Sequence, residues 1–482
     1  MDAETERLRA ENQELRARVR ELEARLRELE ARDGERETTI RALREKLAQL
    51  EVLLEQARRE GRRQAAPFRK AEGPKPDPKK PGRKPGRRYG RHAHREAPPP
   101  ETIDEEYEAC LPDRCPACGS VDLQEEEVVV QYQTEIPRRP IHRKFNIHRG
   151  TCRHCGHSVQ GRHPLQTSDA VGAAASQLGP TAHAAMAMMN KELGLSHGKV
   201  ARCFRELFGI SIARATSARS MLRTAKRCRP VYEEIRAAVQ GSPRVVPDET
   251  GWRVGGRPAW LHVLVGETAT CYVVARGRGH EVAEGVLGLD WPGTMTHDGW
   301  GPYDCFQKAF HQQCLRHLVN RCHEMLQTAV GIAARFPRRV LELAETAFGV
   351  RREYEAGRLT ADQMVDEGLT LGCHLEELAK GRFTYESNRT LAKFLLKHAI
   401  QWFWFLIDPE VDATNYKGEQ AIRPAVVNRK VWGGNRTDHG GDAQSILMSV
   451  FRTCIQVGQT AIDFLVEILC APRPGPLLFA GR

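Results

Sequence analysis

The sequence predicts a multidomain α+β protein, and three observations lead to that fold class. Leucine recurs in a heptad register through residues 1–60, and two Cys-x-x-Cys pairs flank a β-rich stretch further along the chain. From residue 240 onward, strand patterns alternate with helix patterns. A length of 482 residues suggests about three domains, so we expect separate structural units rather than one continuous core.

Residues 1–60 predict a coiled coil. One heptad register places apolar side chains on the seam from Leu8 to Leu54, with a break expected near Gly34. Asn12 at an a position favours a two-stranded partner in register. We therefore expect a homodimer or a higher oligomer, and a lone amphipathic helix packed on the body is the alternative.

Residues 61–100 predict a basic, proline-rich linker. This segment has nine prolines and 13 Lys or Arg residues against three acids, so most of the chain's formal charge of +11 lies here. It has too little apolar surface to fold alone, and its charge suits DNA because each neutralised phosphate releases counterions. A solvated linker is the alternative. The expected DNA contacts are Arg83, Lys84, Arg87 and Arg88.

A zinc-binding module is predicted over residues 101–165. Two Cys-x-x-Cys pairs, each followed by glycine, suit a tetrahedral structural zinc site resembling a zinc ribbon. A hairpin in the β-like stretch between the pairs would bring them together, and reduced core cysteines are the alternative. The four expected zinc ligands are Cys115, Cys118, Cys152 and Cys155.

Helices are predicted over residues 170–235. Gly194, Ser196, Gly209 and Ser211 mark breaks and N-caps, so the pattern indicates helix, turn, helix, turn, helix. A helix-turn-helix that reads DNA is one interpretation, and helical packing without base contacts is equally open. No signal peptide or uninterrupted apolar span is present, which favours a cytoplasmic protein with reduced cysteines and no membrane segment.

The last region predicts three strands, a helix and a fourth strand, an order that resembles the ribonuclease-H-like α/β core. In that fold one acid lies on the first strand and a second follows the fourth strand. VVPDETGWRV and GTMTHDGWGPYD put Asp248 and Asp298 at those places. The expected divisions are a catalytic core at residues 240–320 and 408–470, a helical insertion at 321–407 and a tail at 471–482.

Four motifs, VVPDETGWRV, THDGWGPYD, QCLRHLVNRCHE and NYKGEQAIRPAVVNRKVWGG, together resemble the catalytic region of the IS66 family of bacterial insertion-sequence transposases. The coiled coil, the GRKPG linker and the cysteine pairs match that family in order, so the resemblance covers about residues 1–470. It implies a DDE active site made of Asp248, Asp298 and Glu419.

Phosphodiester chemistry explains these residue types. Cleavage needs an activated water and joining needs an activated 3′-hydroxyl, and two magnesium or manganese ions about 3.5–4 Å apart serve both steps. Such hard cations prefer carboxylate oxygens, which two aspartates and a glutamate supply. For Glu419, a surface ion pair with Arg423, four residues further on, is the alternative.

Several other residues are expected to support the site. Glu249 should point away from Asp248, because successive side chains alternate along a strand. Cys314 and His317 form a Cys-x-x-His pair, which the resemblance implies supports the site or contacts flanking DNA; a core cysteine with a satisfied histidine is the alternative. The expected phosphate contacts after the third acid are Arg423, Arg429 and Lys430.

The sequence therefore predicts a metal-dependent DNA transposase that cleaves and joins the inverted-repeat ends of its own insertion sequence. The expected partners are double-stranded DNA with terminal inverted repeats, further copies of the chain and accessory proteins encoded by the same element. The protein would work at the nucleoid in the bacterial cytoplasm. A zinc-containing DNA-binding regulator or inactive transposase remnant is one alternative, and a ribonuclease-H-like nuclease without strand transfer is another.

Overall fold

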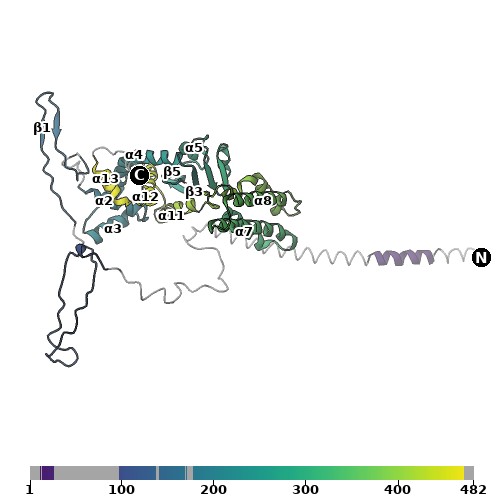
Figure 1. Cartoon of the computed structure of the whole chain (residues 1–482). Coiled ribbons are helices and arrows are strands. Elements are labelled where there is room, and N and C mark those ends of the chain that lie inside the picture. Colours follow the sequence, from purple (N-terminus) through teal and green to yellow (C-terminus); the bar gives the residue numbers. More distant parts are fainter. Residues whose placement is uncertain are drawn as a thin grey trace, which may run out of the picture. The chain divides into compact units, whose positions relative to one another are not determined.

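A computed structural model describes residues 11, 13–26, 97–136, 140–168, 170 and 177–471 (Figure 1). The chain divides into two units, residues 1–106 and residues 107–482.

In the first unit, residues 13–26 are helical, and a short 3₁₀ helix, η1, spans Pro100–Thr102. The seam residues Leu15, Val19, Leu22 and Leu26 are all exposed in the single chain. A helix with an uncovered apolar seam is what a coiled-coil strand requires, and the pairing itself stays a prediction. The rest of the coiled coil with Asn12, and the linker residues Arg83, Lys84, Arg87 and Arg88, lie outside the described residues.

The second unit contains a five-stranded sheet. Its strands are β3 (Arg244–Val254), β4 (Arg257–Val265), β5 (Thr270–Ala275), β6 (Thr294–His297) and β7 (Phe310–Gln313). The spatial order is β5-β4-β3-β6-β7: the first three strands form an antiparallel meander, and β6 and β7 join in parallel. Helix α5 (Glu281–Leu287) connects β5 to β6. The mixed α/β class is confirmed, whereas the short, half-polar β7 was not predicted.

Helices cover both faces of this sheet. They are α2 (Pro180–Lys191), α3 (His197–Phe208), α4 (Arg214–Gln240), α11 (Tyr416–Trp432), α12 (Asp438–Gln456) and α13 (Ala461–Cys470). Val245 faces the core shared with α2, α4, α12 and α13, while the next residue, Val246, faces the core shared with α11. Successive side chains of β3 are therefore buried on opposite faces, as a central strand requires.

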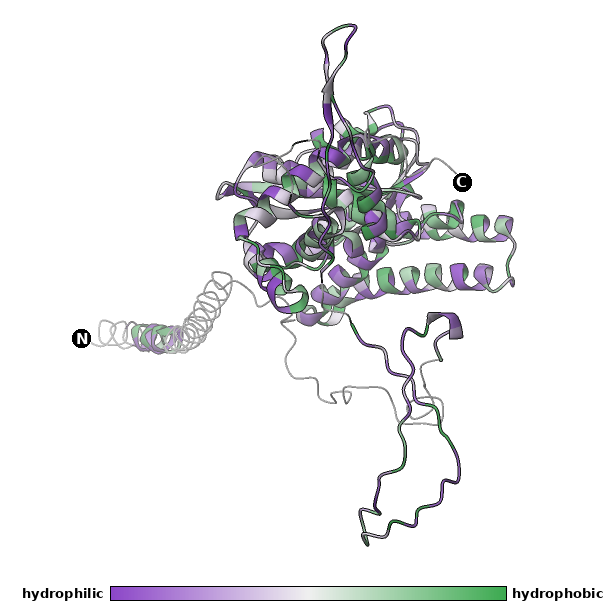
Figure 2. Cartoon of the chain, turned by 90° about the vertical axis from the view of Figure 1, so that its left-hand side faces the viewer, coloured by the Kyte–Doolittle hydropathy of each residue, from purple (hydrophilic) through white to green (hydrophobic). Residues whose placement is uncertain are grey.

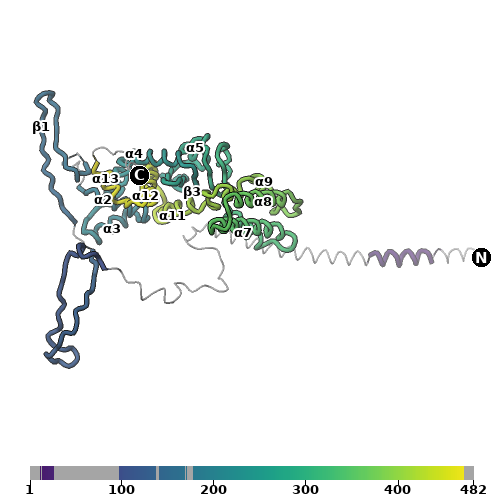
Figure 3. Tube along the Cα trace, in the orientation of Figure 1, coloured from purple at the N-terminus to yellow at the C-terminus, as the bar shows by residue number. Residues whose placement is uncertain are grey.

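The helices that lie between β7 and α11 in the sequence form a second hydrophobic core. They are α6 (Leu315–Thr328), η4 (Gly331–Ala334), α7 (Arg335–Glu355), α8 (Ala361–Ala379), α9 (Glu386–Lys397), η5 (Ala399–Gln401) and α10 (Trp404–Ile407). Figure 3 traces α7, α8 and α9 as neighbouring rods. Trp402, Phe403 and Phe405 are buried in this core, so the aromatic run WFWF mainly packs the insertion. No helix in the described part of the chain has the length and apolarity needed to cross a membrane.

The segment with the cysteine pairs differs from the rest. Strands β1 (Arg149–Thr151) and β2 (Ser158–Gln160) form an antiparallel hairpin around the second pair only. The hairpin expected between the two pairs is absent from residues 103–136 and 140–148. Val128, Val129 and Val130 are largely exposed there, and Figure 2 shows hydrophobic stretches along this segment outside any helix or strand. Residues with high β propensity form a strand only where a neighbouring strand can pair with them, and these residues have no such neighbour.

Candidate active site

The strand register brings Asp248 and Asp298 together. The parallel ladder between β3 and β6 pairs Arg244 with Thr294 and Val245 with Met295. Asp248, on β3, and Asp298, directly after β6, each follow the last pair by three residues, and the charge of Asp298 acts on Asp248. The sequence prediction therefore corresponds to a real juxtaposition in the fold.

The third acid, Glu419, reaches the same place from the first turn of α11. A Cβ atom added to Gly418 would lie 3.2 Å from Cβ of Asp248 and 3.3 Å from the carbonyl oxygen of Pro247. Glycine is therefore the residue that lets this turn sit directly on β3. Glu419 follows Gly418, and its charge acts on Asp248.

Pro424 lies inside α11 and does not end it. Proline cannot donate to the carbonyl four residues earlier, which belongs to Gln420. Arg452 of α12 donates to that carbonyl instead, at 3.3 Å. The helix therefore continues from Tyr416 to Trp432 with the freed acceptor satisfied.

The three acids form a cluster of like charges. The pKa of Asp248 is raised to about 7, mainly by burial, and the charges of Glu249, Asp298 and Glu419 contribute to this rise. The backbone amide of Glu249, which donates to Asp248 Oδ1 at 2.8 Å, acts in the opposite direction. A divalent cation would relieve this repulsion, and three carboxylates are the donor set that Mg²⁺ or Mn²⁺ prefers.

The side chains are not closed around a cation as they stand. Within the described ranges, no group of three or more His, Cys, Asp or Glu side chains is arranged to hold a metal ion. Asp298 accepts a hydrogen bond from the Trp300 amide at 3.0 Å, and Glu419 Oε1 lies 3.9 Å from His317 Nε2.

Cys314 and His317 lie beside the acids at the start of α6. Cys314 is buried, and its amide donates to the carbonyl of His297 at 2.8 Å. A hydrogen bond with Cys314 is the main cause that raises the pKa of His317 to about 9, with further contributions from Asp298 and Glu419 and an opposing one from burial. The pair therefore places a basic group, His317, next to the three acids.

Glu249 faces a different environment from Asp248. Its Oε1 accepts from Arg278 Nε at 2.9 Å and Nη2 at 2.7 Å, and its Oε2 accepts from the Tyr303 hydroxyl at 3.0 Å. Burial, together with Glu249, raises the pKa of Tyr303 well above its usual range, so the hydroxyl keeps the proton it donates. Glu249 is thus a paired carboxylate beside the site.

Sequence reasoning missed Arg278, Trp300 and Tyr303. Arg278 follows the third strand in the run ARGRG, and the other two follow the second acid in DGWGPY. The guanidinium of Arg278 stacks 3.6 Å from the Trp300 ring centroid and 4.7 Å from that of Trp260. The only available signal was the arginine, glycine and aromatic content of two loops.

A buried histidine pair lies under the turn that presents Asp298. His297 Nδ1 accepts from the Gly299 amide at 3.2 Å, and its Nε2 lies 3.1 Å from His311 Nδ1. Burial lowers the pKa of His297 well below its usual range, so the ring is neutral and its Nδ1 can accept from the Gly299 amide. Gly299 has φ +87°, and an added Cβ would lie 3.0 Å from Gln313 Oε1, so this turn requires glycine.

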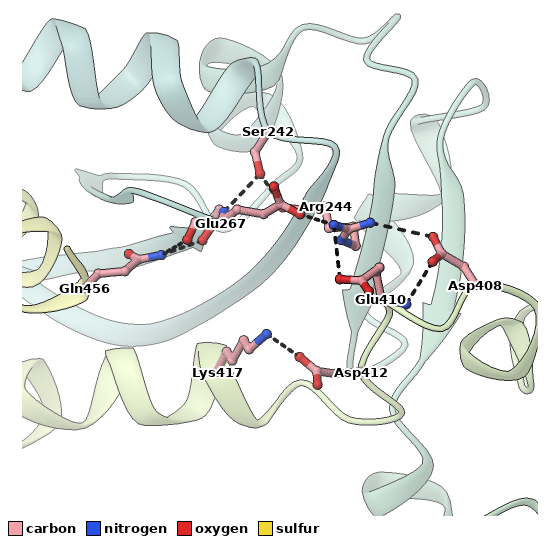
Figure 4. Close-up of polar contacts among 9 residues, drawn as sticks. Ser242, Arg244, Glu267, Asp408, Glu410, Asp412, Lys417 and Gln456 are labelled. Atoms are coloured by element: carbon pink, nitrogen blue, oxygen red, sulfur yellow. Dashed lines mark hydrogen bonds and ion pairs between the residues drawn. The ribbon is translucent and has the colours of Figure 1, made fainter. Parts of the chain in front are cut away.

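The three acids that precede Glu419 in the sequence have other partners. Figure 4 shows Asp408 and Glu410 turned toward Arg244, at 4.0 and 3.8 Å, while Asp412 lies 2.7 Å from Lys417. In the described residues the ion pair of Glu419 is with His317, and none is seen with Arg423. The surface-pair alternative for Glu419 therefore finds no support.

The basic residues that follow Glu419 are not equivalent. Arg423 is exposed, as is Lys430. Arg429 is partly buried and donates to the Thr250 hydroxyl at 3.2 Å and to the Gly251 carbonyl. Arg429 thus ties α11 to β3, a packing role that the sequence did not predict.

Each cysteine pair forms a similar local turn. Gly119 donates to the Cys115 carbonyl at 2.9 Å and Gly156 donates to that of Cys152 at 2.8 Å, with φ of +76° and +70° at the two glycines. Backbone hydrogen bonds, from Cys118 in one turn and Cys155 in the other, are the main cause that lowers the pKa of Cys115 and Cys152. The two turns do not combine into a four-cysteine group within the described residues.

A mixed α/β domain with converging acids on two central strands and a following helix is consistent with a DDE transposase domain. The model of the transposase IS66 family matches residues 175–443, more than half of the chain and the part that contains all three acids. No curated protein gives a significant match. The chain belongs to the IS66 family of transposases, so an activity on DNA is indicated.

Proposed function

We propose that this protein is a DNA transposase that cleaves and joins the inverted-repeat ends of its own insertion sequence. The observation that supports this proposal is the convergence of Asp248, Asp298 and Glu419 in a chain of the IS66 family. Double-stranded DNA is the substrate, and the work would take place at the bacterial nucleoid.

The three acids would hold two Mg²⁺ or Mn²⁺ ions. When bound, these ions lower the pKa of the attacking water or 3′-hydroxyl and offset charge on the leaving oxygen. Asp248 would supply a carboxylate already crowded by neighbouring charges, and Asp298 and Glu419 would supply the other two. His317 balances the cluster from α6, and the exposed Arg423 offers a phosphate contact on the scissile strand.

A structural zinc is a separate part of the proposal. Both cysteine pairs have turns with positive-φ glycines and with amides aimed at one sulfur, which stabilises a thiolate. Four thiolates at two such turns are a donor set that zinc takes. We infer that zinc joins the two turns.

The partners are also part of the proposal. We infer that the coiled coil dimerises and that proteins encoded by the same element assist the reaction.

A strand-transfer assay tests this function. The substrate is DNA from the ends of the element, with its terminal inverted repeats, incubated with Mg²⁺ and the full chain. Wild type is expected to nick and join these ends, while Asp248→Asn and Asp298→Asn bind the DNA without cutting it. Asp290→Asn is the control, because Asp290 is an exposed acid paired with Lys308 at 2.9 Å. Cleavage without joining would indicate a nuclease, and binding without cleavage would indicate a regulator or a remnant.

A further inference from the structure

The two central strands are not joined by main-chain hydrogen bonds where the acids lie. The ladder between β3 and β6 ends at Val245 and Met295, before Asp248 and Asp298. Beyond that point β3 stays paired with β4, and β6 stays paired with β7 as far as His297. The separation of the two acids therefore depends on side-chain contacts rather than on the ladder.

Glu249 provides such contacts from the residue after Asp248. Its side chain is only 4% exposed, and both of its oxygens are used. One oxygen accepts from the Tyr303 hydroxyl at 3.0 Å, and Tyr303 lies in η3 (Gly301–Cys305), which follows Asp298. One hydrogen bond to a charged group therefore links the strand of the first acid to the segment of the second.

Arg278 adds a second link across the same gap. Its guanidinium donates two hydrogen bonds to Glu249 Oε1 and lies 3.6 Å from the ring centroid of Trp300. The amide of Trp300 in turn donates to Asp298 Oδ1 at 3.0 Å. A continuous series of contacts thus runs from the strand of Asp248 to the carboxylate of Asp298.

We propose that Glu249, Arg278, Trp300 and Tyr303 form a clamp that fixes the separation of Asp248 and Asp298 and so sets the affinity for the divalent cation. This inference rests on the proposed function. None of the four side chains touches the reacting atoms, so they are positioning residues. Mg²⁺ demands near-ideal octahedral geometry at about 2.0–2.1 Å, so a small spread of the acids weakens its binding before it disturbs the fold.

Two conservative variants test the clamp. Tyr303→Phe removes one hydrogen bond across the gap, and Arg278→Lys keeps the charge but loses the paired hydrogen bonds and the planar stacking. Each variant should raise the half-saturating Mg²⁺ concentration for cleavage about tenfold, the effect of losing one hydrogen bond to a charged group. Cleavage at saturating Mg²⁺ should fall much less, and DNA binding should not change.

A second readout does not depend on cleavage. Mn²⁺ binding to the full chain, followed by electron paramagnetic resonance, should weaken by a similar factor in both variants. Tyr232→Phe is the matched control: Tyr232 of α4 is buried in the main core, and its hydroxyl donates to the Tyr272 carbonyl of β5 at 2.9 Å. That variant should lose comparable stability and keep wild-type Mn²⁺ affinity.

The outcomes separate the clamp from the function on which it rests. If folded Tyr303→Phe and Arg278→Lys bind Mn²⁺ as wild type does, the clamp is wrong although the metal site stands. If Asp248→Asn also binds Mn²⁺ as tightly as wild type, the metal site itself is wrong. Equal weakening in Tyr232→Phe would also overturn the clamp, since general loss of packing would then explain the effect.

Discussion

The sequence predicts a metal site in two regions of this protein, but the structure brings the predicted ligands together in only one of them. In the catalytic domain, acids from β3, from the end of β6 and from α11 come together through packing of the chain alone. In the cysteine region, each Cys-x-x-Cys turn is formed locally, yet the two turns remain separate within the described residues.

The difference lies in what surrounds the ligands. The acids lie on a sheet buried on both faces, so burial of apolar surface supplies the free energy that brings like charges together. The described residues of the cysteine region include exposed valines, and none of them belongs to a core cluster. We therefore expect the four cysteines to come together only if zinc binds them, whereas packing of the chain already brings the three acids close to one another.

The largest expected effect is loss of zinc from the cysteine region. Purified protein should contain about one zinc per chain, and Cys115→Ser with Cys152→Ser should lose it. Because zinc binding would supply about 10 kcal/mol of folding free energy, residues between the pairs should become sensitive to protease.

The catalytic domain should keep its melting temperature in that variant, since its cores do not include the cysteine pairs. Cys373→Ser, at an exposed single cysteine, serves as the control and should retain zinc. If metal analysis finds no zinc in freshly reduced wild-type protein, zinc does not assemble the cysteine region and the proposed contrast with the acids is wrong.

The next effect concerns Glu419 in the preassembled site. Glu419→Gln removes one anionic ligand at nearly constant shape, so cleavage of end DNA should fall about 1,000-fold, or about 4 kcal/mol in activation free energy. Glu410→Gln is the control, because Glu410 is exposed and lies 3.8 Å from Arg244. Cleavage by Glu419→Gln at close to the wild-type rate would mean that the third ligand lies elsewhere.

The same contrast explains how far sequence reasoning reached. The meander, the helix and the fourth strand follow from periodicity, and Asp248 and Asp298 follow from their places in that order. Gly418 is needed because α11 approaches β3 closely at this residue. Arg278 is held by two tryptophans, Trp260 and Trp300, that are distant from it in the sequence. Such contacts depend on tertiary packing between residues far apart in the chain, which no local pattern encodes. Likewise, the β-prone residues between the cysteine pairs form no strand, because no neighbouring strand pairs with them.

A smaller effect concerns the buried amine of Lys191, whose burial makes the free energy of unfolding depend on pH. Lys191 is 3% exposed, its ammonium donates to Gln444 Oε1 at 2.6 Å, and it lies 5.3 Å from the Trp432 ring centroid. Burial lowers its pKa from 10.5 to about 7. The unfolded chain thus binds this proton more tightly, so between pH 7 and 10.5 the free energy of unfolding should rise with pH.

The expected slope from this group is at most about 1.4 kcal/mol per pH unit. Lys191→Met should remove that slope and be the more stable protein near pH 7, where the folded state holds a buried charge. Lys199→Met, at an exposed lysine of α3, should leave the slope unchanged. Denaturant midpoints at pH 7, 8 and 9 measure the difference, and parallel curves for wild type and Lys191→Met would contradict it.

The smallest effect separates two arginines of α11 that the sequence treated alike. Arg423 is exposed, so if it contacts a phosphate, Arg423→Gln should reduce the slope of log affinity against log salt by about 0.9. Arg429 instead holds Thr250 and Gly251 of β3, so Arg429→Gln should lower the free energy of unfolding by about 1–3 kcal/mol and leave the salt slope unchanged. Salt titrations of DNA binding and denaturant melts of both variants give the two numbers. Exchange of the two outcomes would mean that α11 leaves β3 when DNA binds, and the acids would then not be positioned in advance.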